Sequence, residues 1–415
     1  MTSAIEKVCV IGLGYVGLPT AAVIAGRGMT VLGVDTNGDT VSCVNRGEIP
    51  LVEPYLDVMV KHAVAAGSLT AATEAAPADA FIVAVPTPFA GDHEPDLSYI
   101  RTAVTGMAPH LATGNLVVIE STSPVGTTDA VAAWLGELRP DLAFPPTAGD
   151  AADVNVAHSP ERVLPGQVLR ELVGNDRVVG GLSSTCTQRA VDFYRRFVDG
   201  DCVPTTARTA ELVKLVENAY RDVNIAFANE LSLVCDKLDI DVWDVVDLAN
   251  RHPRVQVLRP GPGVGGHCIA VDPWFIVDSA PDETPLIQAA RAVNDGKPAH
   301  VAARIEAAAA AIDEPCIACL GLAYKADTDD LRESPSVDVA RALVRDGRRL
   351  LVVEPNVTDL PADLASAPDV MHVGLDQALA EANVIVLLTD HKDFREVDAG
   401  RLAGKQVIDT RGLWR

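Results

Sequence analysis

The sequence predicts an α/β protein in which two doubly wound parallel sheets are joined by a central helical domain with one long helix. Three features of the 415 residues support this prediction. Short apolar runs alternate with helical patterns in the first third of the chain, one long amphipathic pattern follows, and a second alternating series closes the chain. A chain of this length also exceeds the size at which a single core stops growing, so several domains are expected.

The first alternating series predicts a Rossmann-like domain over residues 1–200. Runs rich in valine, isoleucine and leucine predict buried strands, and the segments between them are long enough for crossover helices. The predicted strands cover residues 7–11, 30–34, 80–85 and 116–120.

Residues 201–300 predict a central helical domain. From 206 to 238, apolar residues recur without interruption at the spacing of one helix face. Helices of this length often bridge domains or form a dimer face, so a homodimer or a higher homo-oligomer through this helix is expected. After an alanine-rich helix that ends near Ile312, residues 301–415 predict a second Rossmann-like domain, with a helix at 337–345 and strands at 316–321, 350–353, 384–388 and 407–408.

Composition and charge exclude several classes of function. The formal net charge of −23 opposes binding to nucleic acid or to an anionic membrane surface, because like charges repel at long range. The apolar segment 8–25 predicts neither a secretion signal nor a membrane span, because it lacks a preceding basic stretch and is broken by Gly12, Gly14, Gly17 and Pro19. Eight scattered cysteines indicate reduced thiols and a cytoplasmic location.

A glycine motif directly after the first predicted strand indicates a site for a dinucleotide cofactor. Gly12 permits a tight turn, Gly14 lets a pyrophosphate approach the backbone, and Gly17 lets the following helix pack against the strand. The N-terminus of that helix, with Tyr15 and Val16, then faces the phosphates.

Asp35 ends the next predicted strand, about twenty residues after the glycine motif. A carboxylate there accepts hydrogen bonds from the ribose hydroxyls of adenosine and repels a 2′-phosphate. Thr36 and Asn37 supply no arginine that could bind such a phosphate. The expected cofactor is therefore NAD rather than NADP.

Two further strand ends carry hydroxyl groups toward the same edge of the sheet. Thr87, Thr122 and Thr128 are candidates for contact with the cofactor or the substrate. Turn formation is the alternative role for each of them.

Cys268 is the candidate nucleophile. It follows a glycine-dense loop, 261–266, whose open backbone lets a ligand lie against it and leaves the thiol exposed. In a dehydrogenase, a thiolate can trap an aldehyde as a thiohemiacetal, which loses a second hydride to become a thioester. His267 is an alternative as the base of the thiol or as a metal ligand, although adjacent extended residues diverge, and no metal site is expected.

A buried structural role is expected for most of the remaining cysteines, namely Cys9, Cys186, Cys202, Cys235, Cys316 and Cys319. The last two form a CxxC pair, but a predicted strand sends their side chains to opposite faces. Neither a zinc site nor a redox pair is therefore expected there.

The long helix carries candidate residues for proton transfer. Lys214 and Asn218 lie four residues apart on one helix face, with Arg221 one step further along it. An ammonium beside an amide can stabilise an alkoxide-like intermediate, although a solvated helix face is the alternative. Asp272 and Glu161 are candidates for orienting Lys214 or a hydrolytic water.

These motifs together resemble the UDP-glucose/GDP-mannose dehydrogenase family along the whole chain. The matching runs are Gly-Leu-Gly-Tyr-Val-Gly at 12–17, Ser-Pro-Glu-Arg at 159–162, Lys214 with Asn218, Gly-His-Cys at 266–268, Gly-Leu-Ala-Tyr-Lys at 321–325 and Arg-Glu-Ser-Pro at 332–335. Runs 160–166, 250–255 and 266–275 are most similar to family members that act on UDP-N-acetyl-D-mannosamine. The resemblance implies oxidation at C6 of that sugar to UDP-N-acetyl-D-mannosaminuronate, with two NAD reduced, for a surface polysaccharide.

The resemblance also implies roles for individual residues. Cys268 would be the nucleophile and Lys214 the proton donor or acceptor, with Asn218 and Asp272 in support. Arg332 would reach the NAD phosphates. The sugar nucleotide would be bound by Arg162, Val163, Arg221, His252, Arg254, Gly265, Tyr324 and Lys325, of which His252 and Arg254 are candidates to come from a second subunit.

One departure from the family pattern bears on the substrate. Glucose-specific relatives carry a second glutamate four positions after the one matched by Glu161, where this chain has Pro165. This difference counts against UDP-glucose and leaves the water-activating group open among Glu161, Lys214 and Asp272. UDP-N-acetylglucosamine is an alternative substrate. A single-step β-hydroxyacid dehydrogenase is an alternative class, but it needs neither the thiol nor a C-terminal nucleotide domain.

Overall fold

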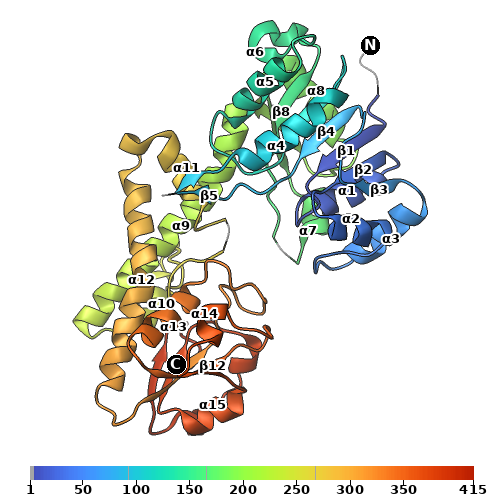
Figure 1. Cartoon of the computed structure of the whole chain (residues 1–415). Helices are drawn as coiled ribbons and strands as arrows, with labels where there is room; N and C mark the ends of the chain where they lie inside the picture. The colour runs from blue at the N-terminus through green and yellow to red at the C-terminus, as the bar shows by residue number, and fades with distance from the viewer. Residues whose placement is uncertain (1–3, 92, 165, 267) are drawn as a thin grey trace. The chain divides into compact units, whose positions relative to one another are not determined.

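The computed structural model describes residues 4–91, 93–164, 166–266 and 268–415 (Figure 1). The chain forms two compact units. The first unit comprises Met1–Glu217 and Trp274–Ala280, and the second comprises Asn218–Pro273 and Pro281–Arg415. Because this division falls inside the long helix, the limits predicted for three domains stay a prediction.

The first unit is built on one sheet of eight strands, in the order β10-β9-β8-β7-β4-β1-β2-β3. Neighbouring strands in this sheet are parallel, except that β9 runs antiparallel to β8. The doubly wound parallel sheet expected from the sequence is therefore confirmed. The strands are β1 (Lys7–Ile11), β2 (Thr30–Val34), β3 (Leu69–Ala72), β4 (Ala80–Val83), β7 (Leu116–Ile119), β8 (Asn155–His158), β9 (Arg177–Gly181) and β10 (Cys202–Thr206).

Helices cover both faces of this sheet because the central strands alternate their side chains between two cores. In β1, Val8 and Val10 belong to one core, whereas Cys9 and Ile11 belong to the other. The helices of this unit are α1 (Gly17–Gly26), α2 (Gly38–Asn45), α3 (Leu56–Ala65), α4 (Ser98–Met107), α5 (Thr127–Leu138), α6 (Pro145–Ala148), α7 (Val168–Gly174) and α8 (Ser184–Tyr194), and a short hairpin joins β5 (Phe89–Ala90) to β6 (Glu94–Pro95).

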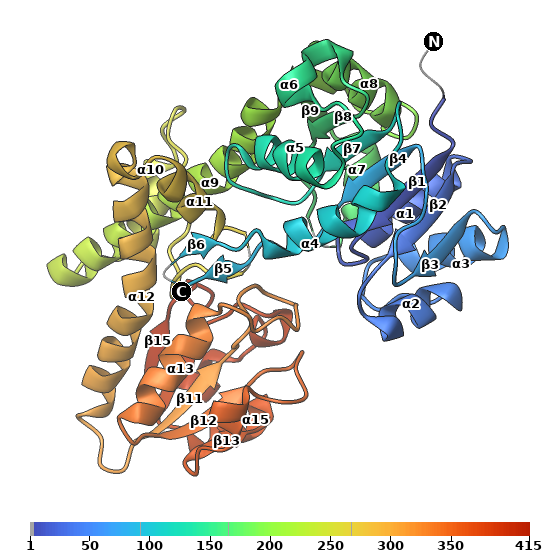
Figure 2. The same ribbon diagram turned by 45° about the horizontal axis from the view of Figure 1, so that its top comes forward.

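The second unit contains a fully parallel sheet of five strands, in the order β13-β12-β11-β14-β15. Figure 2 shows α12 beside α13 and α13 on the sheet. The strands are β11 (Cys316–Leu320), β12 (Arg349–Val353), β13 (Val370–His372), β14 (Val384–Leu387) and β15 (Gln406–Asp409). The helices are α10 (Val242–Ala249), α12 (Pro285–Ala309), α13 (Pro335–Arg345), α14 (Ala362–Ala365), α15 (Leu375–Glu381) and α16 (Ala399–Leu402), while α9 (Ala207–Leu238) and α11 (Asp272–Ser279) cross the division between the units.

The CxxC pair lies in β11, as predicted. Cys316 belongs to the core on one face of the sheet and Cys319 to the core on the other face. Burial also raises the pKa of the Cys319 thiol to about 12. The two sulfurs are therefore structural.

Among the described residues, no helix is both long enough and apolar enough to cross a bilayer. The same residues contain no group of three or more histidine, cysteine or acidic side chains that could hold a metal ion.

A buried ion cluster connects three strand ends of the first unit. Arg177 at the start of β9 lies 2.5 Å from Glu161 and 3.3 Å from Glu120, measured between guanidinium nitrogen and carboxylate oxygen. The Tyr194 hydroxyl donates to Glu120 at 2.6 Å, and its ring centroid lies 4.6 Å from the guanidinium carbon. Burial raises the pKa of Glu120, and the positive charge of Arg177 opposes that rise. Arg177 thus compensates two buried carboxylates.

Replacing Arg177 with Met is expected to lower the free energy of unfolding by about 3–5 kcal/mol, because Glu120 and Glu161 would be left without a cation in the interior. Urea denaturation followed by circular dichroism measures this loss. Arg27→Met is the matched control, since Arg27 pairs with Asp199 at the exposed surface and its removal should change stability far less. Equal losses in the two variants would contradict the interpretation.

Candidate active site

The glycine motif after β1 forms a turn that side chains would block. Gly12 has φ +97°, and a Cβ there would lie 2.3 Å from the Ala84 carbonyl oxygen. A Cβ on Gly17 would lie 1.8 Å from the Gly12 oxygen, so α1 could not approach the turn. The roles predicted for these two glycines are confirmed. Gly14 faces open space, which is what a pyrophosphate needs to reach the backbone.

Asp35 follows β2 and holds this turn in place. Its carboxylate accepts the backbone N–H of Leu13 at 3.0 Å and that of Asn37 at 2.9 Å. Helix α1 begins beside it with no side-chain cap at Val16 and no acidic residue in its first turn, which favours an anion at its N-terminus. Tyr15 is exposed next to this helix end. These residues fit a dinucleotide with ribose hydroxyls near Asp35 and phosphates near α1.

The loops after β4 and β7 are fastened to each other at the same edge of the sheet. Thr87 Oγ1 donates to the Thr122 carbonyl oxygen at 2.6 Å. Ser121 Oγ accepts from Val85 N at 2.9 Å and donates to Val85 O at 2.8 Å. Thr87 and Thr122 are half-buried, so their predicted contacts with ligands stay a prediction.

Thr128 has a structural partner that sequence reasoning missed. Its side chain is buried, and both its hydroxyl and its backbone N–H donate to Glu211 of α9, at 2.5 and 2.7 Å. Gly126 N–H donates to the other oxygen of the same carboxylate at 2.7 Å. Burial raises the pKa of Glu211, and these hydrogen bonds oppose the rise. The only local signal for this contact was a carboxylate on the long helix. The predicted contact of Thr128 with the cofactor stays a prediction.

Glu161 and Arg162 are held by the ion cluster and by α9. Glu161 accepts the Arg162 N–H at 2.6 Å on one oxygen and Arg177 on the other. The Arg162 guanidinium pairs with Glu217 of α9 at 2.5 Å, one turn after Lys214. Lys214 is half-buried, and Val163 packs against the core of the first unit. The first unit therefore brings Glu161 and Arg162 together. The ion pair between Arg162 and Glu217 was not predicted from the sequence.

In the second unit, Cys268 lies at the start of a hydrogen-bonded corner. Its carbonyl oxygen accepts the N–H of Asp272, the first residue of α11, at 2.8 Å. The Asp272 carboxylate is buried and accepts the side-chain amide of Asn218 at 2.5 Å. Two residues named separately from the sequence, Asn218 and Asp272, are therefore in contact. Cys268 is exposed, whereas the six cysteines predicted to be structural are all buried, as expected.

The glycines before Cys268 are required for a different reason from the one expected from the sequence. A Cβ on Gly265 would lie 2.4 Å from the Glu333 oxygen, and one on Gly266 would lie 2.8 Å from the Tyr324 ring. A Cβ on Gly263 would lie 2.7 Å from Pro335. The loop thus packs on the C-terminal segment, and its glycines are needed for this close approach rather than for an open backbone. His267 and Pro165, named from the sequence, lie outside the described residues.

The remaining predicted ligand contacts of the second unit are at its surface. Tyr324 is half-buried, and Lys325 is exposed. Arg332 pairs with Asp330 through two nitrogens, at 2.8 and 2.7 Å. Three further exposed residues are Arg221 on α9 and, in the loop after α10, His252 and Arg254. The first unit thus carries Lys214 and the predicted cofactor residues other than Arg332, and the second carries Arg332 and Cys268. The predicted approach of these groups to one another stays a prediction.

Three segments of the chain match the domains of one family. Residues 6–198 match the NAD binding domain of the UDP-glucose/GDP-mannose dehydrogenase family, residues 208–296 its central domain, and residues 318–415 its UDP binding domain. Together these segments cover most of the chain.

Similar proteins match from end to end. An NDP-N-acetyl-D-galactosaminuronic acid dehydrogenase of Ralstonia solanacearum is 55% identical over 100% of this chain and 98% of its own length. A UDP-N-acetyl-D-mannosamine dehydrogenase of Campylobacter jejuni is 55% identical over 96% of this chain and 98% of its own. The solved structure of a UDP-D-ManNAc dehydrogenase from Pyrococcus horikoshii superposes with a TM-score of 0.89 at 37% identity, over 99% of this chain and 96% of that one. The chain therefore belongs to the UDP-glucose/GDP-mannose dehydrogenase family, and its N-terminal segment is that family's NAD-binding domain.

Proposed function

We propose that the protein oxidises C6 of UDP-N-acetyl-D-mannosamine to the carboxylate of UDP-N-acetyl-D-mannosaminuronate. One alcohol, one water and two NAD⁺ give one carboxylate, two NADH and three protons. The observation that carries this proposal is the exposed Cys268 at a corner built by Asp272 and Asn218, in a chain that also has an NAD-binding domain. A dehydrogenase that stops at the aldehyde has no need of a thiol there.

NAD, when bound, accepts the hydride that leaves C6 in each of the two oxidations. Cys268 acts between them. Its thiolate sulfur forms a bond to C6 of the aldehyde, whose oxygen takes a proton to give a thiohemiacetal. After the second hydride leaves, the thioester is opened by water, which breaks the bond between sulfur and carbon and releases the carboxylate.

Lys214 and Asn218 serve the oxygen on C6 in this proposal. Lys214 takes the hydroxyl proton as the alcohol is oxidised and stabilises the oxyanion afterwards. Asn218 keeps one amide hydrogen on Asp272, which orients the amide so that its second hydrogen is available to the oxyanion. Thr122 lies at the cofactor edge of the first sheet, beside Thr87.

Water activation falls to Lys214 rather than to Glu161. Both oxygens of the Glu161 carboxylate accept hydrogen bonds within the protein, one from the Arg162 N–H and the other from Arg177, so this side chain already holds two groups in place. We assign Glu161 to the orientation of Arg162, whose guanidinium is a candidate for contact with the sugar nucleotide.

A second candidate substrate has the galacto configuration. Relatives of equal identity are named for N-acetyl-D-mannosamine and for N-acetyl-D-galactosaminuronic acid, so the comparisons favour an N-acetylhexosamine over glucose. A single-step β-hydroxyacid dehydrogenase is disfavoured, because residues 318–415 match a UDP binding domain that such an enzyme does not need. The cytoplasmic location stays a prediction.

We also propose that α9 forms a homodimer interface. Large apolar side chains on this helix are exposed at Tyr220 (71%), Phe227 (60%), Val234 (47%) and Leu238 (60%). At about 100° per residue, these four positions share one face of the helix, apart from Asn218 and Arg221. An apolar stripe of this kind is stabilised by burial against a second copy of itself.

Purified protein is expected to form two NADH per UDP-N-acetyl-D-mannosamine consumed, and Cys268→Ala is expected to form no uronate, because no thioester can form. Absorbance of NADH, with mass spectrometry of the sugar nucleotide, measures both. Cys43→Ala, which changes a partly exposed cysteine of α2, is the control. A ratio of one NADH per sugar, uronate formation by Cys268→Ala, or activity only on a free hydroxy acid would contradict the proposal.

Replacing Lys214 with Ala is expected to lower kcat by about 10²–10⁴-fold, the usual contribution of a positioned acid–base group. Steady-state kinetics with saturating NAD measure the effect. Lys237→Ala removes an exposed lysine from the last turn of the same helix and should leave kcat unchanged. A loss of less than about tenfold would remove Lys214 from the mechanism.

The double change Tyr220→Asp and Phe227→Asp is expected to convert the homodimer to a monomer, because two charges would be desolvated in the interface. Sedimentation velocity at micromolar protein resolves the two species. Lys237→Asp, which lies off the apolar stripe, should remain dimeric. A native protein that sediments as a monomer, or a double variant that stays dimeric, is incompatible with an interface on α9.

A further inference from the structure

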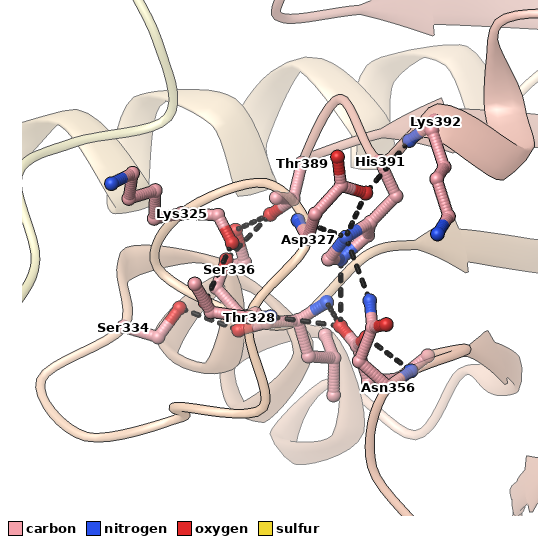
Figure 3. Close-up of polar contacts among 12 residues, drawn as sticks. Lys325, Asp327, Thr328, Ser334, Ser336, Asn356, Thr389, His391 and Lys392 are labelled. Carbon is pink, nitrogen blue, oxygen red and sulfur yellow. Dashed lines mark hydrogen bonds and ion pairs between the residues drawn. The ribbon is translucent and has the colours of Figure 1, made fainter. Parts of the chain in front are cut away.

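The loop of residues 321–328 leads from β11 into the surface of the UDP-binding domain. It carries Tyr324 and Lys325, our candidates for contact with the nucleotide end of the substrate. This segment belongs to neither a helix nor a strand, so other groups must hold its shape. Figure 3 shows that those groups converge on it from the ends of β12 and β14.

Glu354, which follows β12, anchors the beginning of this loop. One carboxylate oxygen accepts the N–H of Leu322 at 2.6 Å and that of Ala323 at 2.9 Å. The other oxygen accepts the N–H of Asn356 at 3.2 Å. Burial raises the pKa of Glu354, but hydrogen bonds from His391 and Ala323 outweigh it, so the net shift is downward and the group is an anion. The side chain is only 3% exposed.

His391 anchors the end of the loop. Its ring is fully buried, and Nδ1 accepts the N–H of Asp327 at 2.9 Å and lies 3.1 Å from the side-chain amide of Asn356. Two donors directed at Nδ1 require that the ring proton sits on Nε2. Nε2 lies 3.2 Å from Glu354, so the imidazole donates to the same carboxylate that holds the beginning of the loop.

The backbone of Asp327 needs this support. It has φ +59°, a left-handed backbone conformation that residues other than glycine rarely adopt. Its carboxylate accepts the Lys392 N–H at 3.0 Å, and Thr389 Oγ1 donates to the Ala323 carbonyl at 2.6 Å. The loop is thus fixed on both sides of the two residues that are proposed to meet the nucleotide. Figure 3 shows one of them, Lys325, with residues that hold the loop.

Glu354 occupies the position in its sheet that Asp35 occupies in the first unit. Each carboxylate follows the second strand of its sheet and accepts the N–H of the leucine that comes after the glycine of the first turn. Each also accepts the N–H of the asparagine two positions after itself, Asn37 or Asn356. Asp35 is half-buried, which suits contact with a ribose. Glu354 is sealed under the loop and His391, so it cannot serve a second dinucleotide in the same way.

We propose that Glu354 and His391 are positioning residues for substrate binding, which hold the loop 321–328 in the shape that presents Tyr324 and Lys325 to the UDP-sugar. This inference rests on the proposed function. Neither side chain is exposed enough to meet the nucleotide itself.

Two substitutions at His391 separate its two contacts. His391→Asn keeps an acceptor near the place of Nδ1 and loses the donor to Glu354, whereas His391→Gln keeps a donor near the place of Nε2 and loses the acceptor for Asp327. We expect His391→Gln to raise the Kd for UDP and the KM for the UDP-sugar by about 10-fold to 100-fold, because the partly buried N–H of Asp327 loses its acceptor and the end of the loop is released. His391→Asn should raise both by less than about tenfold, and kcat and the KM for NAD should change little in either variant.

Titration calorimetry with UDP alone is the primary measurement, because it does not require turnover. His372→Gln is the matched control: His372 also lies at hydrogen-bond distance from Glu354, with Nε2 3.3 Å from its carbonyl oxygen, and this hydrogen bond goes to the residue after β12 and not to the loop. Asp327→Gly is a second variant. Glycine adopts the left-handed backbone without strain, but the hydrogen bond from the Lys392 N–H is lost, so this variant should also raise the Kd for UDP.

Equal weakening by His391→Asn and His391→Gln, or no weakening by His391→Gln and Asp327→Gly beyond the His372→Gln control, would overturn the proposal. If the native protein binds UDP but oxidises no UDP-sugar, the proposed function fails, and the Kd values for UDP still decide the role of His391.

Discussion

A carboxylate at the end of the second strand holds the turn after the first strand in both sheets, and the candidate sites depend on this contact. Asp35 accepts the N–H of Leu13, and Glu354 accepts the N–H of Leu322. In each case the preceding glycine has a positive φ and donates to the end of the second strand. The turn leaves backbone N–H groups without a partner in a helix or strand, and one charged side chain accepts hydrogen bonds from them.

The two sites differ because the chain continues differently after this turn. In the first unit, α1 begins at Gly17, so the helix N-terminus itself is available to phosphates. In the second unit, α13 begins only at Pro335, and the intervening loop presents side chains instead of a helix end. His391 seals the carboxylate of the second site, whereas Asp35 stays half-buried. One architecture can therefore serve a dinucleotide in one unit and a sugar nucleotide in the other.

The sequence was sufficient for features with a local signature. Strands β1 and β2 and helix α9 lie within one residue of their predicted ends, because their apolar periodicity is strong. Strand β9 was missed because it begins with an arginine and ends with two glycines. Its Arg177 is paired with carboxylates that lie 16 and 57 residues earlier in the chain. A pairing over such a distance leaves no local pattern in the sequence. The same reason hid Glu211, whose partners Gly126 and Thr128 lie at the start of α5.

The glycines before Cys268 show how packing sets the geometry of a site. Gly265 and Gly266 lie against Tyr324 and Glu333 so closely that a single added carbon would collide with them. The backbone before the thiol is therefore held at contact distance from the loop that carries Tyr324, within one compact unit. A UDP-sugar has its nucleotide and its C6 at opposite ends, so an enzyme must fix the separation between the groups that bind each end. In the proposed function Cys268 meets C6 and Tyr324 meets the nucleotide, so the close packing of Gly265 and Gly266 against Glu333 and Tyr324 would fix part of that separation. The Glu354 contacts hold the loop that carries Tyr324.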